Sequence, residues 1–289
     1  MSGERIAIDA WATLITPEGA TRWPEDYLRI FRKYKSPRIQ FEGQTIAEMV
    51  ADMDASNIDR CILSAFYHKD LAVISNDEVA EFVRQYPDRF VGAGTVNVMR
   101  KPMDVAREIE RQVHELGMCA IRLEPYMYGD GVTGLPPTDK HYWPIYVKCV
   151  ELGVPVCIQV GHTGPTLPSE CGRPIHLDEV ALAFPELKIV GCHLGQPWHD
   201  EMMILAWKHD NIFIETSARL PKHWPPSFVE FVQGRGQDKV IWATDYPLLP
   251  FARTLDELEP LGLPDGIYRK LVRDNAASVF NIDLGSPSA

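Results

Sequence analysis

The sequence lacks the marks of membrane, secreted and nucleic-acid-binding proteins. No apolar run approaches the ~18 residues of a membrane-spanning helix. The opening residues, MSGERIAIDA, carry charge and have no apolar signal-peptide region. The 29 Lys and Arg residues are outnumbered by 40 Asp and Glu residues, and the formal net charge is -11. Nucleic-acid binding needs a basic surface, so we expect no nucleic-acid partner. Without a membrane span or a signal-peptide region, we also expect a cytoplasmic protein with no membrane partner.

Two common motifs are also missing. The six cysteines include no C-x-x-C pair, and most of them lie within apolar runs such as CILSAF and VCIQV. This pattern is typical of small buried thiols in a reducing compartment, not of a disulfide framework. No Gly-x-Gly-x-x-Gly follows a predicted strand, which disfavours an open dinucleotide-binding sheet.

Short β-branched runs alternate with helix-like segments along the whole chain. Helical spacing is clear in residues 45–57, and Asn76 is the predicted cap of the helix that ends near Pro87. The alternation predicts an α/β fold, a single (β/α)8 TIM barrel over residues 1–289, with an insert at about 14–43 and a flexible tail at about 284–289. The predicted strands are residues 6–12, 58–66, 90–98, 119–125, 154–161, 188–195, 212–218 and 240–245.

Polar and aromatic residues gather at the predicted strand ends, where barrels of this kind carry their active sites. Two histidines and several carboxylates are more than a scaffold needs, so we expect a catalytic site. The alternative is a barrel without catalysis that serves as a binding protein. The candidate residues are Trp11, Thr13, Arg122, Glu124, Gln159, His162, His193, Glu215 and Asp245.

Two motifs carry a family resemblance. VGCHLGQPWHDEMM ends the sixth predicted strand in His-x-Gly, and IWATDYPLLP ends the last in Thr-Asp-Tyr-Pro. In this order they resemble the amidohydrolase superfamily, within it the branch of aminocarboxymuconate semialdehyde decarboxylase and the resorcylate and carboxyvanillate decarboxylases. The stretch VGHTGPTLPSECGRPIHLDEVALAFPELKIV, with IDAW near the start, resembles a subgroup that includes 4-hydroxyphenyl-β-ketoacyl-CoA hydrolase.

The resemblance implies a divalent metal, usually zinc, with four ligands. The corresponding positions here are Trp11, Thr13, Gln159 and Asp245, and only Asp245 matches. Indole, a neutral hydroxyl and an amide oxygen are poor zinc ligands. Two alternatives remain open. A rearranged metal site would use His162, His193 and Asp245.

In a metal-free site, Asp245 would be the general base or position a water, and His193 would be the acid or oxyanion donor. The resemblance implies that His193 acts as an acid/base or polarises the substrate, as the matching histidine does in the family. Trp11 would then form a wall of an aromatic substrate pocket, although a strand tryptophan is as often a core residue. Arg122 and Gln159 are expected to contact substrate, and a structural ion pair between Arg122 and Glu124 is an equal alternative.

The subgroup resemblance implies cleavage of a C–C bond in an aryl β-ketoacyl-CoA, giving an aromatic acid and acetyl-CoA. The alternative is a non-oxidative decarboxylase or hydratase of an aromatic or muconate-type acid. A basic stretch, YLRIFRKYKSPR, includes Arg32, Lys33 and Lys35 and is expected either to hold the phosphates of coenzyme A or to form a solvated helix face. The resemblance also implies a homo-oligomer.

Overall fold

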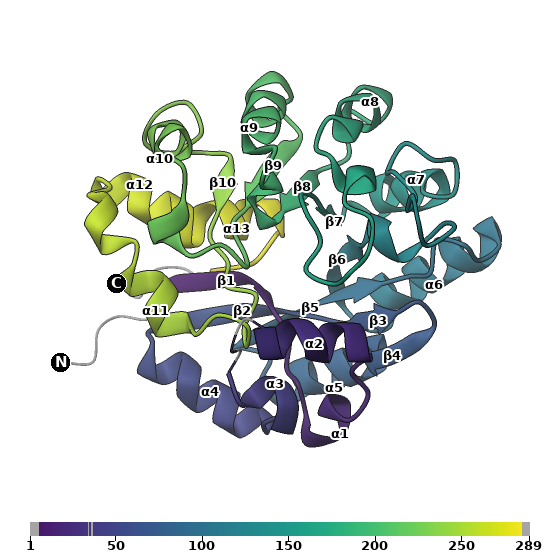
Figure 1. The fold of residues 1–289 in the computed structure, drawn as a ribbon, viewed down its shortest axis with the longest axis horizontal. Helices are drawn as coiled ribbons and strands as arrows, with labels where there is room; N and C mark the ends of the chain where they lie inside the picture. Colours follow the sequence, from purple (N-terminus) through teal and green to yellow (C-terminus); the bar gives the residue numbers. More distant parts are fainter. Residues whose placement is uncertain (1–5, 34, 36, 285–289) are drawn as a thin grey trace.

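The chain forms a ring of eight parallel strands in a computed structural model that describes residues 6–284 except 34 and 36 (Figure 1). The ring is completed where the segment after β10 meets β1, through a parallel bridge between Ala12 and Tyr246. The predicted (β/α)8 barrel is therefore confirmed. The strands pair in the order β1 (Ala7–Ala12), β2 (Ile58–Ser64), β5 (Phe90–Thr95), β6 (Met118–Leu123), β7 (Val156–Gln159), β8 (Ile189–Cys192), β9 (Ile212–Glu215) and β10 (Val240–Ile241).

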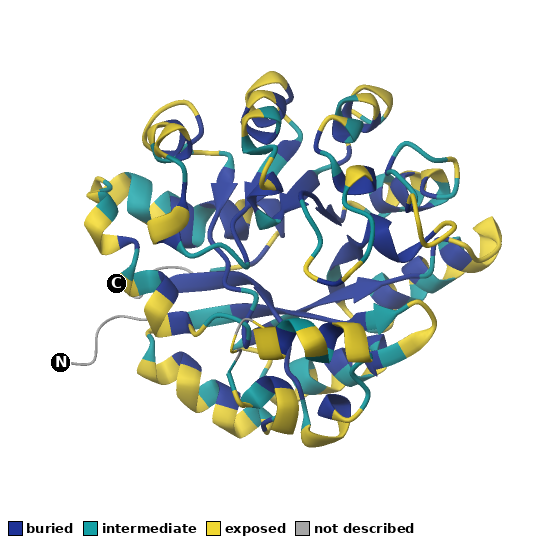
Figure 2. Cartoon of the chain, in the orientation of Figure 1, coloured by how far each residue is buried: buried dark blue, intermediate teal, exposed yellow. Residues whose placement is uncertain are grey.

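An outer layer of helices covers the ring. The helices bury one face against the strands and expose the other, as the banded colouring in Figure 2 shows. None of the described helices is long and apolar enough to cross a membrane. The helices are α4 (Ile46–Ala55), α5 (Asn76–Gln85), α6 (Pro102–His114), α7 (Trp143–Leu152), α8 (His176–Ala183), α9 (His199–Lys208), α10 (Pro226–Gln233), α11 (Phe251–Asp256), α12 (Asp265–Arg269) and α13 (Asn275–Val279).

The interior of the ring is a packed core that is closed at one end. Strand side chains alternate between the outer and inner faces, and the inner set includes Ile8, Ala10 and Ile62. The segment from α13 onward packs Phe280 and Ile282 into the same cluster. Because this segment seals the amino-terminal end, only the carboxyl ends of the strands can open towards a substrate.

The insert after β1 lies over that carboxyl end. It holds the helices α1 (Pro17–Ala20), α2 (Glu25–Lys33) and α3 (Ile39–Glu42). The rings of Trp23 and Tyr27 lie 5.1 Å and 5.2 Å from the ring of Phe66, which follows β2. The Tyr27 hydroxyl lies 3.1 Å from that of Tyr126, which follows β6. Helix α2 therefore bridges two strand ends on the open side (Figure 1).

Two local predictions are wrong. Residues after β2 form an antiparallel hairpin of β3 (Phe66–His68) and β4 (Leu71–Ile74), which the strand prediction did not include. The cap of α5 is Ser75, whose hydroxyl accepts from the Glu78 N–H, so it is not Asn76. Asn76 is buried and bonds the backbone of Thr95. The predicted flexible tail lies almost wholly outside the described residues.

Candidate active site

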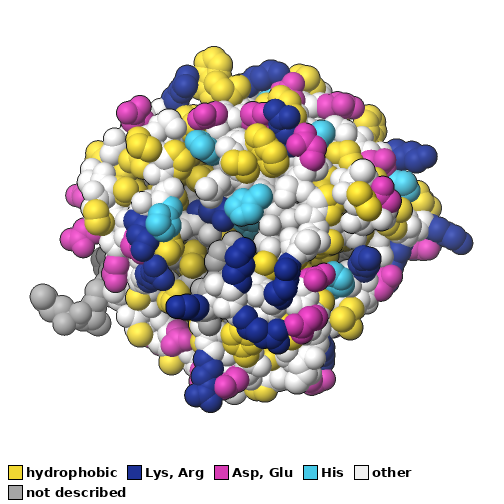
Figure 3. Space-filling view, viewed as in Figure 1, with side chains coloured by type: hydrophobic (Ala, Val, Ile, Leu, Met, Phe, Trp, Pro, Cys, Tyr) yellow, Lys and Arg dark blue, Asp and Glu magenta, His cyan; other side chains and the backbone are white. Residues whose placement is uncertain are grey.

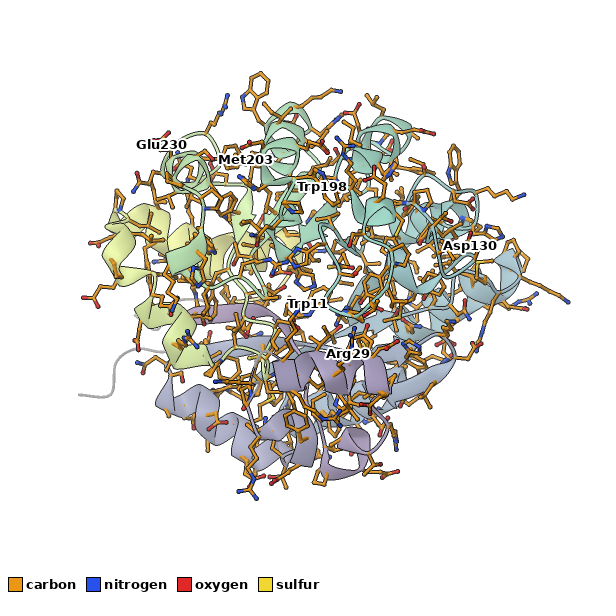
Figure 4. All side chains as sticks on the ribbon, in the orientation of Figure 1. Trp11, Arg29, Asp130, Trp198, Met203 and Glu230 are labelled. Carbon is orange, nitrogen blue, oxygen red and sulfur yellow. The ribbon has the colours of Figure 1, made fainter. Side chains whose placement is uncertain are left out.

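A buried arginine lies at the centre of the candidate site. Alternation along β6 turns Arg122 inward, where its guanidinium carbon lies 3.6 Å from the centre of the Trp11 ring. Arg122 Nε lies 2.8 Å from Glu124 Oε1, although the N–H is not aligned for a hydrogen bond. Arg122 and Glu124 are only 5% and 2% exposed. The expected ion pair between Arg122 and Glu124 is therefore present, and its cation faces inward. Figure 4 shows Trp11 near the middle of the ring of strands.

The sequence prediction missed Asp9, which holds the site together from behind. This fully buried carboxylate accepts from the backbone N–H groups of Trp11 and Thr244, each at 3.0 Å, and from the Thr244 hydroxyl. It thereby ties the end of β1 to the segment that carries Asp245. Burial raises the pKa of Asp9 to about 7, and these hydrogen bonds oppose the rise. The sequence feature that could have identified Asp9 is that it is a single acidic residue within the apolar strand sequence IAIDAWA.

Asp245 lies next to Trp11 and Arg122. Its N–H donates to the Trp11 carbonyl at 2.9 Å. Burial raises the pKa of Asp245 to about 6, while Arg122 and the Trp11 indole favour the carboxylate. The indole N–H does not reach full hydrogen-bond geometry. A carboxyl group with this pKa can exchange a proton near neutral pH.

His193 follows β8 and faces Trp11, with the two ring centres 5.6 Å apart. Its Nδ1 lies 2.6 Å from Ser217 Oγ and 3.3 Å from the Ser217 carbonyl. Since a carbonyl only accepts, this contact favours a proton on Nδ1 and leaves Nε2 as an acceptor. Burial, and then Arg219 and Arg122, hold the pKa of His193 well below its usual range.

The backbone at both candidate catalytic residues is left-handed. His193 has φ 64° and Asp245 has φ 65°, and neither residue is a glycine. This conformation costs free energy for most side chains and is frequent at functional sites. The surrounding contacts, including those of Asp9 and Ser217, keep both side chains in place.

Gln159 and His162 lie beside this group. Gln159 is buried at the end of β7, in register with Cys192, and its Oε1 has no hydrogen-bond partner among the described residues. His162 Nδ1 lies 3.1 Å from the Gln196 carbonyl and 3.2 Å from an Arg219 nitrogen. Burial and Arg219 lower the pKa of His162. Ser217 and Arg219 were missed: the strand predicted at 212–218 ends at Glu215 in the structure, and strand patterns do not predict the conformation of the loop that follows.

The residues present do not fit the family's metal. Within the part of the chain that the structure describes, no three His, Cys, Asp or Glu side chains lie close enough to hold an ion. The alternative set of His162, His193 and Asp245 is therefore not assembled. The buried guanidinium of Arg122 beside Asp245 would also repel a second cation there.

The basic residues of the insert lie outside this buried group. Arg32, Lys33 and Lys35 are exposed, and Arg32 forms an ion pair with Glu25 at 2.6 Å. Figure 3 shows basic side chains gathered over and around α2 on the open face. Figure 4 labels Arg29 on the same helix, and in this view its label lies near that of Trp11.

Sequence comparison decides the family. The family described as Amidohydrolase matches residues 8–282. The chain belongs to the amidohydrolase family. Two curated relatives match in part: 2-keto-4-carboxy-3-hexenedioate hydratase of Sphingobium sp. (30% identical over 141 residues, 43% of this chain and 41% of the relative) and 2-amino-3-carboxymuconate-6-semialdehyde decarboxylase of Dictyostelium discoideum (33% over 89 residues, 31% and 23%). The matches span less than half of either relative.

Solved structures also match over nearly the whole chain. An uncharacterised TIM-barrel protein of Bordetella bronchiseptica superposes with a TM-score of 0.80 at 22% identity, covering 95% of this chain and 98% of that one. A 5-carboxyvanillate decarboxylase of Sphingomonas paucimobilis gives 0.71 at 21% identity, covering 97% and 100%. At these identities the likeness establishes the fold. This amidohydrolase is thus an enzyme-family member with decarboxylases and a hydratase among its relatives.

Proposed function

We propose that this amidohydrolase adds water to a ketone and cleaves the adjacent C–C bond without a metal. The observation that carries the proposal is the buried Arg122 guanidinium, which packs on the Trp11 ring beside Asp245. The uncharged imidazole of His193 contacts the same Trp11 ring. These groups supply a fixed positive charge, an aromatic wall and a proton acceptor. The substrate class is an aryl β-ketoacyl thioester, with coenzyme A as the proposed carrier.

The reaction would begin with a water held by the Asp245 carboxylate. His193 Nε2 takes a proton from this water, and the hydroxide attacks the aryl ketone carbon. The resulting oxyanion is stabilised by the Arg122 guanidinium. The alkoxide then collapses, the bond to the CH2 carbon breaks, and the electron pair goes to the thioester enolate.

The protonated His193 closes the cycle. It gives its proton to the enolate carbon, which yields an acetyl thioester and an aromatic acid and restores the neutral imidazole. Because a 1,3-dicarbonyl substrate has a stabilised enolate as its leaving group, less electrophilic assistance is needed than for an amide. The aromatic group of the substrate would pack against Trp11, and the unpartnered oxygen of Gln159 would accept a hydrogen bond from a substrate hydroxyl.

Decarboxylation of an aromatic or muconate-type acid is a second candidate. It is favoured by the decarboxylases among the relatives. The fixed charge of Arg122 would bind the carboxylate, and a carboxyl group with a pKa of about 6, Asp245, would donate the proton that replaces CO2. Against it, decarboxylases of the resembling branch use a metal, and the residues here do not form its site.

The deciding experiment is an assay of the purified protein with 3-(4-hydroxyphenyl)-3-oxopropanoyl-CoA. Release of acetyl-CoA and 4-hydroxybenzoate in equal amounts, detected by chromatography, is the expected result. A parallel assay measures CO2 release from hydroxybenzoates and carboxymuconates. Release of CO2 without acetyl-CoA would replace the hydrolase by the decarboxylase.

His193→Asn is the matched test variant, and His114→Asn, on the outer helix α6, is its control. His193→Asn should lose turnover while keeping the wild-type circular dichroism and thermal midpoint. His114→Asn should retain wild-type turnover as well as the wild-type circular dichroism and thermal midpoint. A folded His193→Asn variant with full activity would remove His193 from the mechanism.

A further inference from the structure

Ser217 connects two ionisable groups that the proposed mechanism treats separately. Its Oγ lies 2.8 Å from Glu215 Oε2 and 2.6 Å from His193 Nδ1. Its backbone N–H donates to Glu215 Oε1. Glu215 and Ser217 are fully buried, so water does not compete for these contacts. The three residues therefore form a short hydrogen-bonded chain that ends at the imidazole facing Trp11.

One hydroxyl proton must serve both ends of this chain. When Glu215 is a carboxylate, the Ser217 hydroxyl donates to Oε2. Ser217 Oγ then has only lone pairs to offer His193, so Nδ1 must carry the imidazole proton. In this arrangement Nε2 is unprotonated and can accept a proton.

The opposite arrangement follows when Glu215 is protonated. The carboxyl proton can be donated to Ser217 Oγ, and the Ser217 hydroxyl then turns to donate to His193 Nδ1. A neutral imidazole that accepts at Nδ1 carries its proton on Nε2. In this arrangement Nε2 is a hydrogen-bond donor, able to contact an oxyanion but unable to activate a water.

We propose that Ser217 transmits the protonation state of Glu215 to His193 and so decides whether Nε2 accepts or donates a proton. Ser217 and Glu215 are positioning residues in this scheme, because neither contacts the substrate. The catalytic consequence rests on the proposed function, whereas the position of the imidazole proton does not.

The surroundings of Glu215 make both arrangements accessible. Burial raises its pKa to about 8, the contacts with Ser217 oppose the rise, and the nearby carboxyl groups of Asp245 and Asp9 add to it. The Cys192 thiol, on the neighbouring strand β8, also interacts with Glu215. Glu215 therefore loses its proton as pH rises through about 8, and the proton-accepting form of Nε2 that the proposed function uses becomes available in the same direction.

The groups around His193 keep the imidazole itself neutral. Arg219 from the loop after β9, Arg122 from β6 and His162 from the loop after β7 all disfavour the imidazolium. With a neutral ring, the remaining variable is the nitrogen that carries the single proton. Nδ1 has two partners: the Ser217 carbonyl at 3.3 Å favours a proton on Nδ1, and a Ser217 hydroxyl that donates across the shorter 2.6 Å contact opposes it.

The test is NMR of nitrogen-labelled histidine side chains in the whole protein, with His193→Asn used to assign the His193 signals. Above the pKa of Glu215, the wild-type protein should show a protonated Nδ1. In Glu215→Gln, Oε1 must still accept from the Ser217 N–H, so the amide NH2 takes the place of Oε2 and donates to Ser217 Oγ. The Ser217 hydroxyl then donates to Nδ1, and the proton should move to Nε2.

His209 is an internal control, because its Nε2 lies 2.7 Å from Asp178 Oδ1 in the outer helical layer and its signals should be the same in Glu215→Gln as in the wild-type protein. The double variant Glu215→Gln/Ser217→Ala should lose the proton shift seen in Glu215→Gln. A folded Glu215→Gln protein that keeps the proton on Nδ1 overturns the proposal. If this variant does not fold, the wild-type protein decides: no change in the protonated nitrogen as Glu215 titrates also overturns it.

The two proposals fail separately. Movement of the proton to Nε2 in a protein that does not cleave the ketoacyl thioester would reject the proposed function and leave the Ser217 connection intact. Cleavage of the thioester by a protein whose His193 proton stays on Nδ1 would do the reverse. If both hold, Glu215→Gln should lower kcat at least tenfold and leave KM unchanged, because only proton transfer is affected.

Discussion

At the scale of single residues, the site is built on charges held out of water. Arg122 and Glu124 compensate each other inside the ring, and burial alone would disfavour each charge. The pair places a positive charge beside Trp11. The strand sequence CAIRLEP does not predict this contact, because strand alternation shows which side chains face inward and not which of them touch. The ion pair suggested by the sequence thus exists, and it is part of the site.

Removal of Arg122 should be costly. Arg122→Met leaves Glu124 buried without its partner, and the free energy of unfolding should fall by about 3–5 kcal/mol. Because burial already raises the pKa of Glu124, protonation relieves this cost, and the loss should be smaller at acidic pH. Chemical denaturation at two pH values measures the effect. Arg122→Met/Glu124→Gln is the control and should recover part of the loss; equal losses would mean that the pair is not coupled.

Asp9 should make stability depend on pH. Its pKa is raised from 3.8 to about 7 in the folded chain, so the folded state binds more protons than the unfolded state between these values. Stability should therefore fall as pH rises from about 4 to 7, with Glu215 and Asp245 adding to the fall. Asp9→Asn should remove up to about 4 kcal/mol of this fall in the free energy of unfolding between about pH 4 and 7, as measured by chemical denaturation. An unchanged slope would mean that Asp9 is ionised in the folded chain.

At the scale of elements, the strand–helix alternation made most of the barrel predictable. The positions of β1, β2, β5 and β6 follow from apolar periodicity, and the helices from their stripes. The hairpin of β3 and β4 was not predictable, because seven residues with one partner strand have no distinctive period. The cap at Ser75 was missed for a related reason: Ser75 and Asn76 are equally good caps, and tertiary packing of Asn76 against Thr95 decides between them.

The basic face of α2 offers a test of the coenzyme A proposal. Replacing Arg32, Lys33 and Lys35 with Ala should raise KM for the ketoacyl-CoA several-fold and leave KM for a short aromatic acid or pantetheine thioester unchanged. Steady-state kinetics at low salt measures the change. Substitution of the exposed Lys101 and Arg107 at α6 is the control, and equal effects at both places would reject a specific phosphate site.

At the scale of the whole molecule, the predicted architecture was confirmed and the site was only partly predictable. Trp11, Arg122, His193 and Asp245 were identified as strand-end residues, and they meet at one end of the ring. The connections of His193 through Ser217 were not foreseen, because they depend on the backbone after β9. Sequence periodicity thus located the residues, and loop geometry determined their partners.

Metal removal should have no effect. Because the ligand positions hold Trp11, Thr13 and Gln159, and Arg122 supplies a fixed charge, prolonged dialysis against a chelator should change neither turnover nor the thermal midpoint. Elemental analysis before and after dialysis checks that the treatment worked. Activity that is lost with the chelator and returns with added zinc or manganese would overturn the metal-free mechanism.

The hydrogen bonds of Asp9 to Thr244 join residues 235 positions apart. On a ribosome, β1 emerges long before the segment that it must meet, and it stays without this partner until nearly all of the barrel has been made. The pocket therefore cannot be assembled before Thr244 has been made. A nascent or truncated chain that stops before Thr244 lacks both Asp245 and the partner of Asp9, so it has no active centre of this kind.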